Sequence, residues 1–224
     1  MIAPSPSGLR SSTAGATAAG SSQQLLENAV DGDRTALERL LLIEFGAVQR
    51  HIARQIPDWQ RGAVIVEDLL QDTFAQAFRD IGRIDVQSER SLRAWLCTIA
   101  DHRLQDLLRR LRRKKRGGGR APTRSLVDAH HSSLLELATL VFDGGDSPSQ
   151  AAGRGEVVQA VHVGLSSLPE DQREAVRRRF VERQDYVAAG KAMGRSPEAV
   201  RSLVYRAKHS LRDFMGRSSR WFFK

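Results

Sequence analysis

The sequence contains very little cysteine. Cys97 is the single one among 224 residues, so the chain cannot form an internal disulfide or build a zinc site from several thiolates. A chain without disulfides suits the reducing cytoplasm, which is the location we expect. Cys97 itself lies within an apolar helical pattern, and this favours a small buried side chain over a reactive thiol.

Long apolar runs are also missing. No stretch is long enough to span a bilayer, which predicts that the protein does not insert into a membrane. The N-terminal residues are rich in Ser, Ala, Gly, Thr and Pro, and they lack the apolar segment of a secretory signal peptide. We interpret residues 1–24 as a disordered tail, because this composition offers too little apolar surface to bury.

Positive charge, in contrast, is abundant. The sequence has 35 Lys and Arg against 26 Asp and Glu, a formal net charge of +9. A chain this basic often binds a polyanion, usually nucleic acid, although charge can also serve solubility alone. The charge is clustered, since seven of the eight residues at 109–116 are Arg or Lys, and this clustering favours nucleic acid.

Apolar residues recur at steps of three and four, which predicts helices, and no segment shows the period-two alternation of a strand. The clearest stripes lie at 33–56, 67–81, 91–111 and 156–215. The fold class expected is therefore all-α, with two small helical domains joined by a flexible linker. The predicted organisation is a tail at 1–24, a first domain at 25–116, a linker at 117–155, a second domain at 156–216 and a C-terminal tail at 217–224. Within the linker, residues 134–142 are apolar enough to form a short docking helix.

Residues 185–211 carry the most specific local pattern, that of a helix-turn-helix. Gly194 permits a tight turn, Ser196 is a good N-cap and Pro197 suits the first turn of the second helix. In a DNA-binding helix-turn-helix, the N-terminal part of the second helix enters the major groove. The residues predicted to contact DNA here are Arg195, Ser196, Glu198, Arg201, Ser202, Tyr205, Arg206 and Lys208. The alternative is an ordinary helical hairpin with a solvated charged face.

The chemistry of these helix-turn-helix side chains favours two kinds of DNA contact, with base edges and with phosphates. Arg201, Ser202 and Glu198 have the donors and acceptors to read base edges, and Arg201 also suits a phosphate. Arg195, Arg206 and Lys208 suit phosphates, which position a protein on DNA without reading its sequence.

The helix predicted at 91–116 is a second candidate for DNA binding. Its arginines suit the phosphate backbone, so binding is expected to weaken steeply with salt. Trp95 has the shape to stack on an unpaired base, but it lies on the apolar stripe and is interpreted as core. The predicted contacts are Arg93, His102, Arg103, Gln105, Asp106, Arg109, Arg110, Arg112 and Arg113. The alternative is a basic helix end that is merely solvated.

The stretch 67–80 has an acidic face opposite its apolar stripe, and this face carries Asp68, Gln71 and Asp72. An acidic surface repels DNA, so it suits a protein partner with a basic surface. The alternative is a solvated face that balances the basic helix.

Three segments in this order resemble the extracytoplasmic-function (ECF) group of the sigma-70 family of bacterial RNA polymerase subunits. EDLLQDTFAQAF at 67–78 is similar to region 2.2, and SLRAWLCTIADHRLQDLLRR at 91–110 to regions 2.3 and 2.4. The segment 165–212, which contains the helix-turn-helix, is similar to region 4. The resemblance implies a sigma factor that recognises the −35 and −10 promoter elements and aids strand opening. It also implies the polymerase-docking residues Asp68, Leu69, Gln71, Asp72 and Phe74.

The resemblance further implies partners: core RNA polymerase and promoter DNA, with an anti-sigma factor left open by the sequence. We expect a monomer when free. One departure from the family is Gly190, where a small helix former is usual, and glycine there lowers helix propensity.

Two other classes of protein are alternatives to a sigma factor. A dimeric helix-turn-helix regulator would bind a palindromic site without polymerase. A DNA recombinase would need a catalytic domain before the hairpin. The sequence shows no catalytic triad, metal-ligand cluster or phosphate-binding loop. We therefore predict no catalytic residues, no metal site, no cofactor and no enzyme activity.

Overall fold

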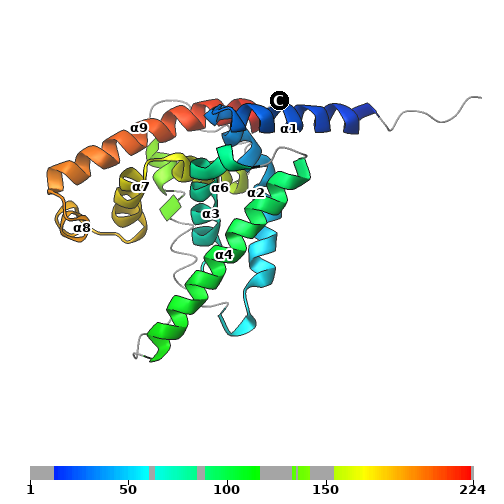
Figure 1. The fold of residues 1–224 in the computed structure, drawn as a ribbon. Coiled ribbons are helices and arrows are strands. Elements are labelled where there is room, and N and C mark those ends of the chain that lie inside the picture. The colour runs from blue at the N-terminus through cyan, green and yellow to red at the C-terminus, as the bar shows by residue number, and fades with distance from the viewer. Residues whose placement is uncertain are drawn as a thin grey trace, which may run out of the picture.

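The structure is a computed structural model that describes residues 13–60, 64–84, 89–116, 133–134, 136–141 and 154–222. Within these ranges the chain forms helices and turns and no strand, which confirms the all-α fold class (Figure 1). The N-terminal half contains α1 (Thr13–Val30), α2 (Arg34–Gln55), η1 (Asp58–Gln60), α3 (Val66–Asp80), η2 (Ile81–Arg83) and α4 (Glu89–Arg116). The C-terminal half contains α6 (Arg154–Ser167), α7 (Glu170–Val176), the π-helical segment η3 (Arg177–Val181), α8 (Tyr186–Met193) and α9 (Pro197–Phe222).

At both ends of the described chain, a helix extends into a segment that composition predicted to be a tail. Helix α1 begins at Thr13, within the segment expected to be a disordered tail, and Leu26 and Ala29 are buried against the rest of the fold. Residues 1–12 lie outside the described residues. At the other end, α9 continues to Phe222, although a tail was expected from 217. Helices α1 and α9 thus extend beyond the bounds that composition suggested.

The core of the N-terminal half follows the predicted stripes. Asp33 caps α2, because its carboxylate accepts hydrogen bonds from the backbone amides of Thr35 and Ala36 at 2.8 and 3.1 Å. Helices α2, α3 and α4 pack together around fully buried side chains. The rings of Phe45 and Phe74 meet edge to face, with centroids 6.0 Å apart.

The linker prediction concerned residues 117–155, most of which lie outside the described residues. The described part, at 133–134 and 136–141, is helical and docked, as its apolar pattern predicted. Leu134, Leu137 and Val141 are buried. Arg212 of α9 donates to the Val141 carbonyl oxygen at 3.1 Å, which ties this segment to the C-terminal half.

The two halves pack against each other, which the sequence did not predict. Helix α6 lies against both α2 and α3. The ring of His162, on α6, lies 5.9 Å from the ring of Phe45, on α2. At a second point, Arg217 of α9 donates to both carboxylate oxygens of Glu38 on α2, at 3.2 and 3.0 Å. Burial raises the pKa of Glu38, and the hydrogen bond from Arg217 opposes this rise.

The turn of the helix-turn-helix is built as predicted. Gly194 ends α8 in the left-handed conformation, with φ of 63°, which a glycine adopts without strain. The Ser196 hydroxyl accepts from the backbone amide of Ala199 at 3.1 Å and so caps α9. Within the described residues, no helix has the length and apolar character needed to cross a membrane.

The turn also explains Gly190, which the sequence marked as a departure that costs helix propensity. A methyl group at this position would lie 2.7 Å from the carbonyl oxygen of Arg195 and 3.3 Å from the nitrogen of Pro197. The glycine therefore lets α8 approach the turn closely. We expect Gly190→Ala to destabilise the protein by about 1–3 kcal/mol, measured by urea unfolding, because the backbone of the turn must shift.

Gly216→Ala is the matched control for this substitution. Gly216 lies within α9 and a methyl group there meets nothing within 4 Å. Alanine at Gly216 should stabilise the protein by up to about 1 kcal/mol. Equal effects of the two substitutions would contradict the role of Gly190 in the turn.

Candidate nucleic-acid and protein interfaces

The acidic face of α3 carries the residues expected to bind a protein. Asp68 and Asp72 are exposed and Gln71 is half-buried. Leu69 and Phe74, which were predicted to dock on polymerase as well, are 3% and 0% exposed. Both belong to the core between α3 and its neighbours, so neither side chain can contact a partner while this core is intact. Of the five predicted docking residues, Asp68, Gln71 and Asp72 are the ones with accessible side chains.

A groove of about 500 Å³ runs beside this acidic face. One wall is formed by Asp68, Gln71 and Asp72 of α3 and a second by side chains of α4, including Arg103 and Arg110. Arg177, from the C-terminal half, completes the lining. Acidic and basic side chains thus face each other across the groove.

The C-terminal part of α4 projects away from the rest of the molecule and presents the basic cluster (Figure 1). Arg103 is half-buried and donates a hydrogen bond to Gln76 of α3, which orients its side chain. The other predicted contacts on this part of α4 are exposed: His102, Gln105, Asp106, Arg109, Arg110, Arg112 and Arg113. They form a long, accessible and mostly basic face that fits a duplex or a separated strand.

Arg93 does not share this face. It lies near the start of α4, and its Nε donates to Glu44 at 2.6 Å. The Glu44 side chain is 1% exposed, so Arg93 compensates a buried carboxylate that would otherwise be costly. Arg93 therefore contributes to the stability of the fold, and its contact with DNA stays a prediction. Trp95, interpreted as core, is half-buried and packs against the core cluster.

The helix-turn-helix lies at the end of the molecule that carries α8, well separated from the projecting end of α4 (Figure 1). Most of the predicted contacts are exposed there: Arg195, Ser196, Glu198, Arg201, Ser202, Tyr205 and Arg206, with Lys208 half-buried. The guanidinium of Arg201 stacks 5.1 Å above the ring of Tyr186, which pre-orients it.

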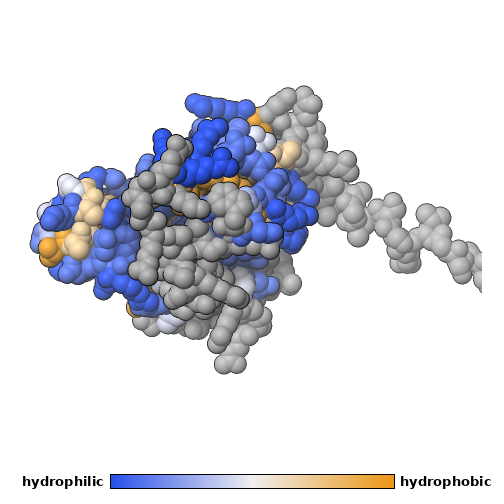
Figure 2. Space-filling view, turned by 90° about the horizontal axis from the view of Figure 1, so that it is seen from below, coloured by the Kyte–Doolittle hydropathy of each residue, from blue (hydrophilic) through white to orange (hydrophobic). Residues whose placement is uncertain are grey.

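Two further features bear on what this end of the molecule contacts. Arg195 is paired with Asp171 of α7 at 2.5 Å, so part of its charge is used within the protein. Figure 2 shows hydrophobic residues at the α8 end among a mostly hydrophilic surface, and Val187 of α8 is 66% exposed. Tyr205 on α9 is 71% exposed. Apolar surface beside a recognition helix fits contact with thymine methyl groups.

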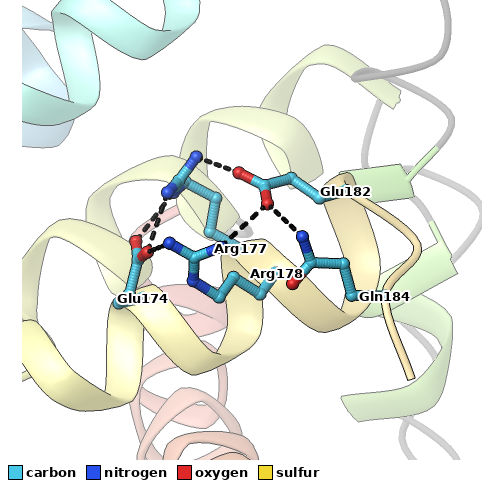
Figure 3. Close-up of polar contacts among 5 residues, drawn as sticks. All are labelled: Glu174, Arg177, Arg178, Glu182 and Gln184. Carbon is cyan, nitrogen blue, oxygen red and sulfur yellow. Dashed lines mark hydrogen bonds and ion pairs between the residues drawn. The ribbon is translucent and has the colours of Figure 1, made fainter. Parts of the chain in front are cut away.

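The structure adds a charged cluster that the sequence interpretation missed (Figure 3). Arg177 donates to both carboxylate oxygens of Glu174 at 2.8 Å and also pairs with Glu182. Arg178 pairs with the same two glutamates. The hydrogen bond from Arg177 lowers the pKa of Glu174, and the same bond raises the pKa of Arg177. The cluster fixes Arg177 at the edge of the α3 groove.

A signal for this cluster was present in the sequence. Glu174, Arg177, Arg178 and Glu182 are spaced at three to five residues, which is typical of pairs on one helix. Their relation to α3 is long-range and has no sequence signal. Among the described residues, no group of His, Cys, Asp or Glu is arranged to hold a metal ion.

Comparison with known proteins identifies the family of the chain. Residues 46–114 match Sigma-70 region 2, and residues 159–211 match Sigma-70, region 4. The chain is 31% identical to RNA polymerase sigma factor CarQ of Myxococcus xanthus, over 85% of this chain and 95% of the relative. It is 29% identical to RNA polymerase sigma-H factor of Pseudomonas aeruginosa, over 84% of this chain and 91% of the relative.

A more distant similarity links the chain to a solved structure of CnrH in complex with the cytosolic domain of CnrY. It covers 88% of this chain and 98% of that one, at 22% identity and a TM-score of 0.32. The sequence matches are the ones that decide the family. The chain belongs to the sigma-70 family, in its ECF group. It is a sigma factor, which binds core RNA polymerase and promoter DNA and directs promoter-specific initiation of transcription.

Proposed function

We propose that the sigma factor uses three separate surfaces, one to bind core RNA polymerase and two to bind promoter DNA. Asp68, Gln71 and Asp72 on α3 dock on core RNA polymerase. The exposed face of α4, from His102 to Arg113, binds the −10 element and holds the separated strand. The N-terminal half of α9, with Arg201 and Ser202, reads the −35 element.

One observation carries this proposal: a single chain presents an exposed acidic face and two separate exposed basic faces. The end of α4 and the helix-turn-helix lie at different ends of the molecule (Figure 1). Two DNA-binding modules on one chain gain avidity only when their sites are correctly spaced, and a promoter supplies that spacing. The acidic face of α3 repels DNA, so we assign it to the binding of the protein partner.

We further propose that residues 25–116 act as the polymerase-binding and −10 unit and residues 156–216 as the −35 unit. The matched ranges at 46–114 and 159–211 fall inside these bounds. The chain supplies binding energy for strand opening, by capturing unpaired bases, and makes or breaks no bond itself. It acts in the cytoplasm, where polymerase and template meet.

In vitro transcription tests this function directly. Core RNA polymerase is incubated with genomic DNA of the same bacterium, with and without the purified chain, and transcript 5′ ends are mapped. We expect a new set of discrete start sites that share two upstream elements at constant spacing. Initiation at these sites should fall steeply as salt rises, because phosphate contacts release counterions. An unchanged set of start sites would contradict the proposal.

A further inference from the structure

The aromatic ring of Tyr186, the first residue of α8, carries two arginines. The guanidinium of Arg201, on α9, lies 5.1 Å from the ring centroid, and that of Arg179, in η3, lies 5.5 Å from it. A cation at this distance from an aromatic face is attracted by the negative charge of the ring's π system. Tyr186 is half-buried and packs against the core cluster, so the fold sets the position of its ring.

The backbone before Tyr186 brings the ring to these arginines. The Asp185 carboxylate accepts from the backbone amide of Ala188 at 2.7 Å and so caps α8. Arg183, two residues before this cap, has a φ of 55°, which turns the chain sharply between η3 and α8. Helix α8 packs against η3 after this turn. The contact between Tyr186 and Arg179 therefore follows from the course of the backbone.

Arg179 is the third of three consecutive arginines, and its contacts differ from those of the other two. The two preceding arginines pair with the glutamates of the charged cluster (Figure 3). Within the described part of the chain, no carboxylate pairs with Arg179. Its guanidinium lies instead over the ring of Tyr186 and, at 5.8 Å, over that of Phe180. The charge of Arg179 is therefore available to an external anion.

Arg201 has the same kind of surroundings. It is exposed, and no carboxylate of the described residues pairs with it either. Two like charges are thus gathered at one ring, and their mutual repulsion is unfavourable in the free protein. A polyanion that contacts both guanidiniums relieves this repulsion. Promoter DNA, which α9 is proposed to read, is a polyanion of this kind.

From these contacts we infer that Tyr186 is a positioning residue of the −35 interface, whose ring holds Arg201 for a base edge and Arg179 for a phosphate of the same element. This inference rests on the proposed reading of the −35 element by α9. It adds two residues to the interface that the sequence did not predict. A side chain that is held in place before contact loses less entropy on binding, so loss of the ring weakens both contacts.

The test removes the ring with Tyr186→Leu and keeps it with Tyr186→Phe, in the full-length chain bound to core polymerase. Leucine is apolar but cannot attract a guanidinium as an aromatic ring does. We expect Tyr186→Leu to reduce discrimination at the −35 position read by Arg201 by about 3- to 10-fold, and Tyr186→Phe to stay within about 2-fold of the wild type. Discrimination is a ratio of transcription from two promoters, so a smaller folded fraction leaves it unchanged.

A double variant separates positioning from a purely structural role. Tyr186→Leu combined with Arg201→Ala should discriminate no worse than Arg201→Ala alone, because both changes remove the same contact. Additive losses would overturn the inference, as would a loss in Tyr186→Phe as large as that in Tyr186→Leu. Wild-type discrimination in Tyr186→Leu, where Arg201→Ala has lost it, would overturn it too. Full discrimination in Arg201→Ala would instead overturn the proposed reading of the −35 element by Arg201.

Arg179→Gln tests the phosphate contact and leaves the ring in place. We expect the affinity of the holoenzyme to fall about 3- to 10-fold for every −35 sequence alike, and its salt dependence to fall by about one counterion. The matched control is Arg54→Gln, which removes the same charge from an exposed position on α2. This control should leave both quantities unchanged. Equal effects of the two substitutions would overturn the assignment of Arg179 to DNA.

Discussion

Replacing Asp68 and Asp72 with lysine should weaken the binding of core RNA polymerase by at least about 100-fold, or about 3 kcal/mol. Both carboxylates are exposed on α3, so neither is needed for the core and the fold should survive the change. Reversing their charge places repulsion where the partner's basic surface must approach. Affinity for core polymerase, measured by anisotropy of a labelled chain, checks this.

The matched control is Glu27→Lys with Asp31→Lys, two exposed positions in α1 and the turn after it. This variant changes the net charge equally and should bind polymerase as the wild type does. Unimpaired binding of the α3 variant would exclude α3 as the docking face.

The second large effect is expected from a pair of arginines on the two DNA-binding faces. Arg201→Ala should reduce discrimination at one position of the −35 element by about 1–3 kcal/mol, which corresponds to roughly 5- to 150-fold. The guanidinium of Arg201 is exposed and pre-oriented over Tyr186, so little entropy is lost when it contacts a base. Transcription from a library of −35 sequences measures the effect.

Arg112→Ala serves as the comparison, because Arg112 is exposed on the projecting part of α4. We expect this substitution to lower the affinity of the holoenzyme for all promoters alike and to reduce the salt dependence by about one counterion. A loss of sequence discrimination that is equal in the two variants would contradict the division between base reading and phosphate binding.

Much of the fold could be predicted because its signals are local. The Gly194 turn and the Ser196 cap each depend on a few adjacent residues, and the structure confirms both. Apolar spacing likewise predicted the helices and the docking of residues near 134–141. Such features are determined by backbone geometry and hydrogen bonding within one or two turns of helix.

The contacts of other residues could not be predicted, because their partners are distant in the sequence. Arg93 lies in a basic helix, and only the structure shows that it pairs with a buried glutamate 49 residues away. Leu69 and Phe74 lie beside the acidic residues of α3, and only packing shows that they belong to the core. Gly190 reduces helix propensity locally, but the close approach of the turn requires it.

The sequence by itself determined the helices, their caps, the helix-turn-helix and the separation of acidic and basic faces, since periodicity and charge are properties of neighbouring residues. The tertiary structure alone decided how the two halves meet. The contacts of Ser166 with Gln71 and of Arg217 with Glu38 join residues that are 95 and 179 positions apart. No local pattern encodes such contacts, because they depend on which buried surfaces and charges the whole chain brings together.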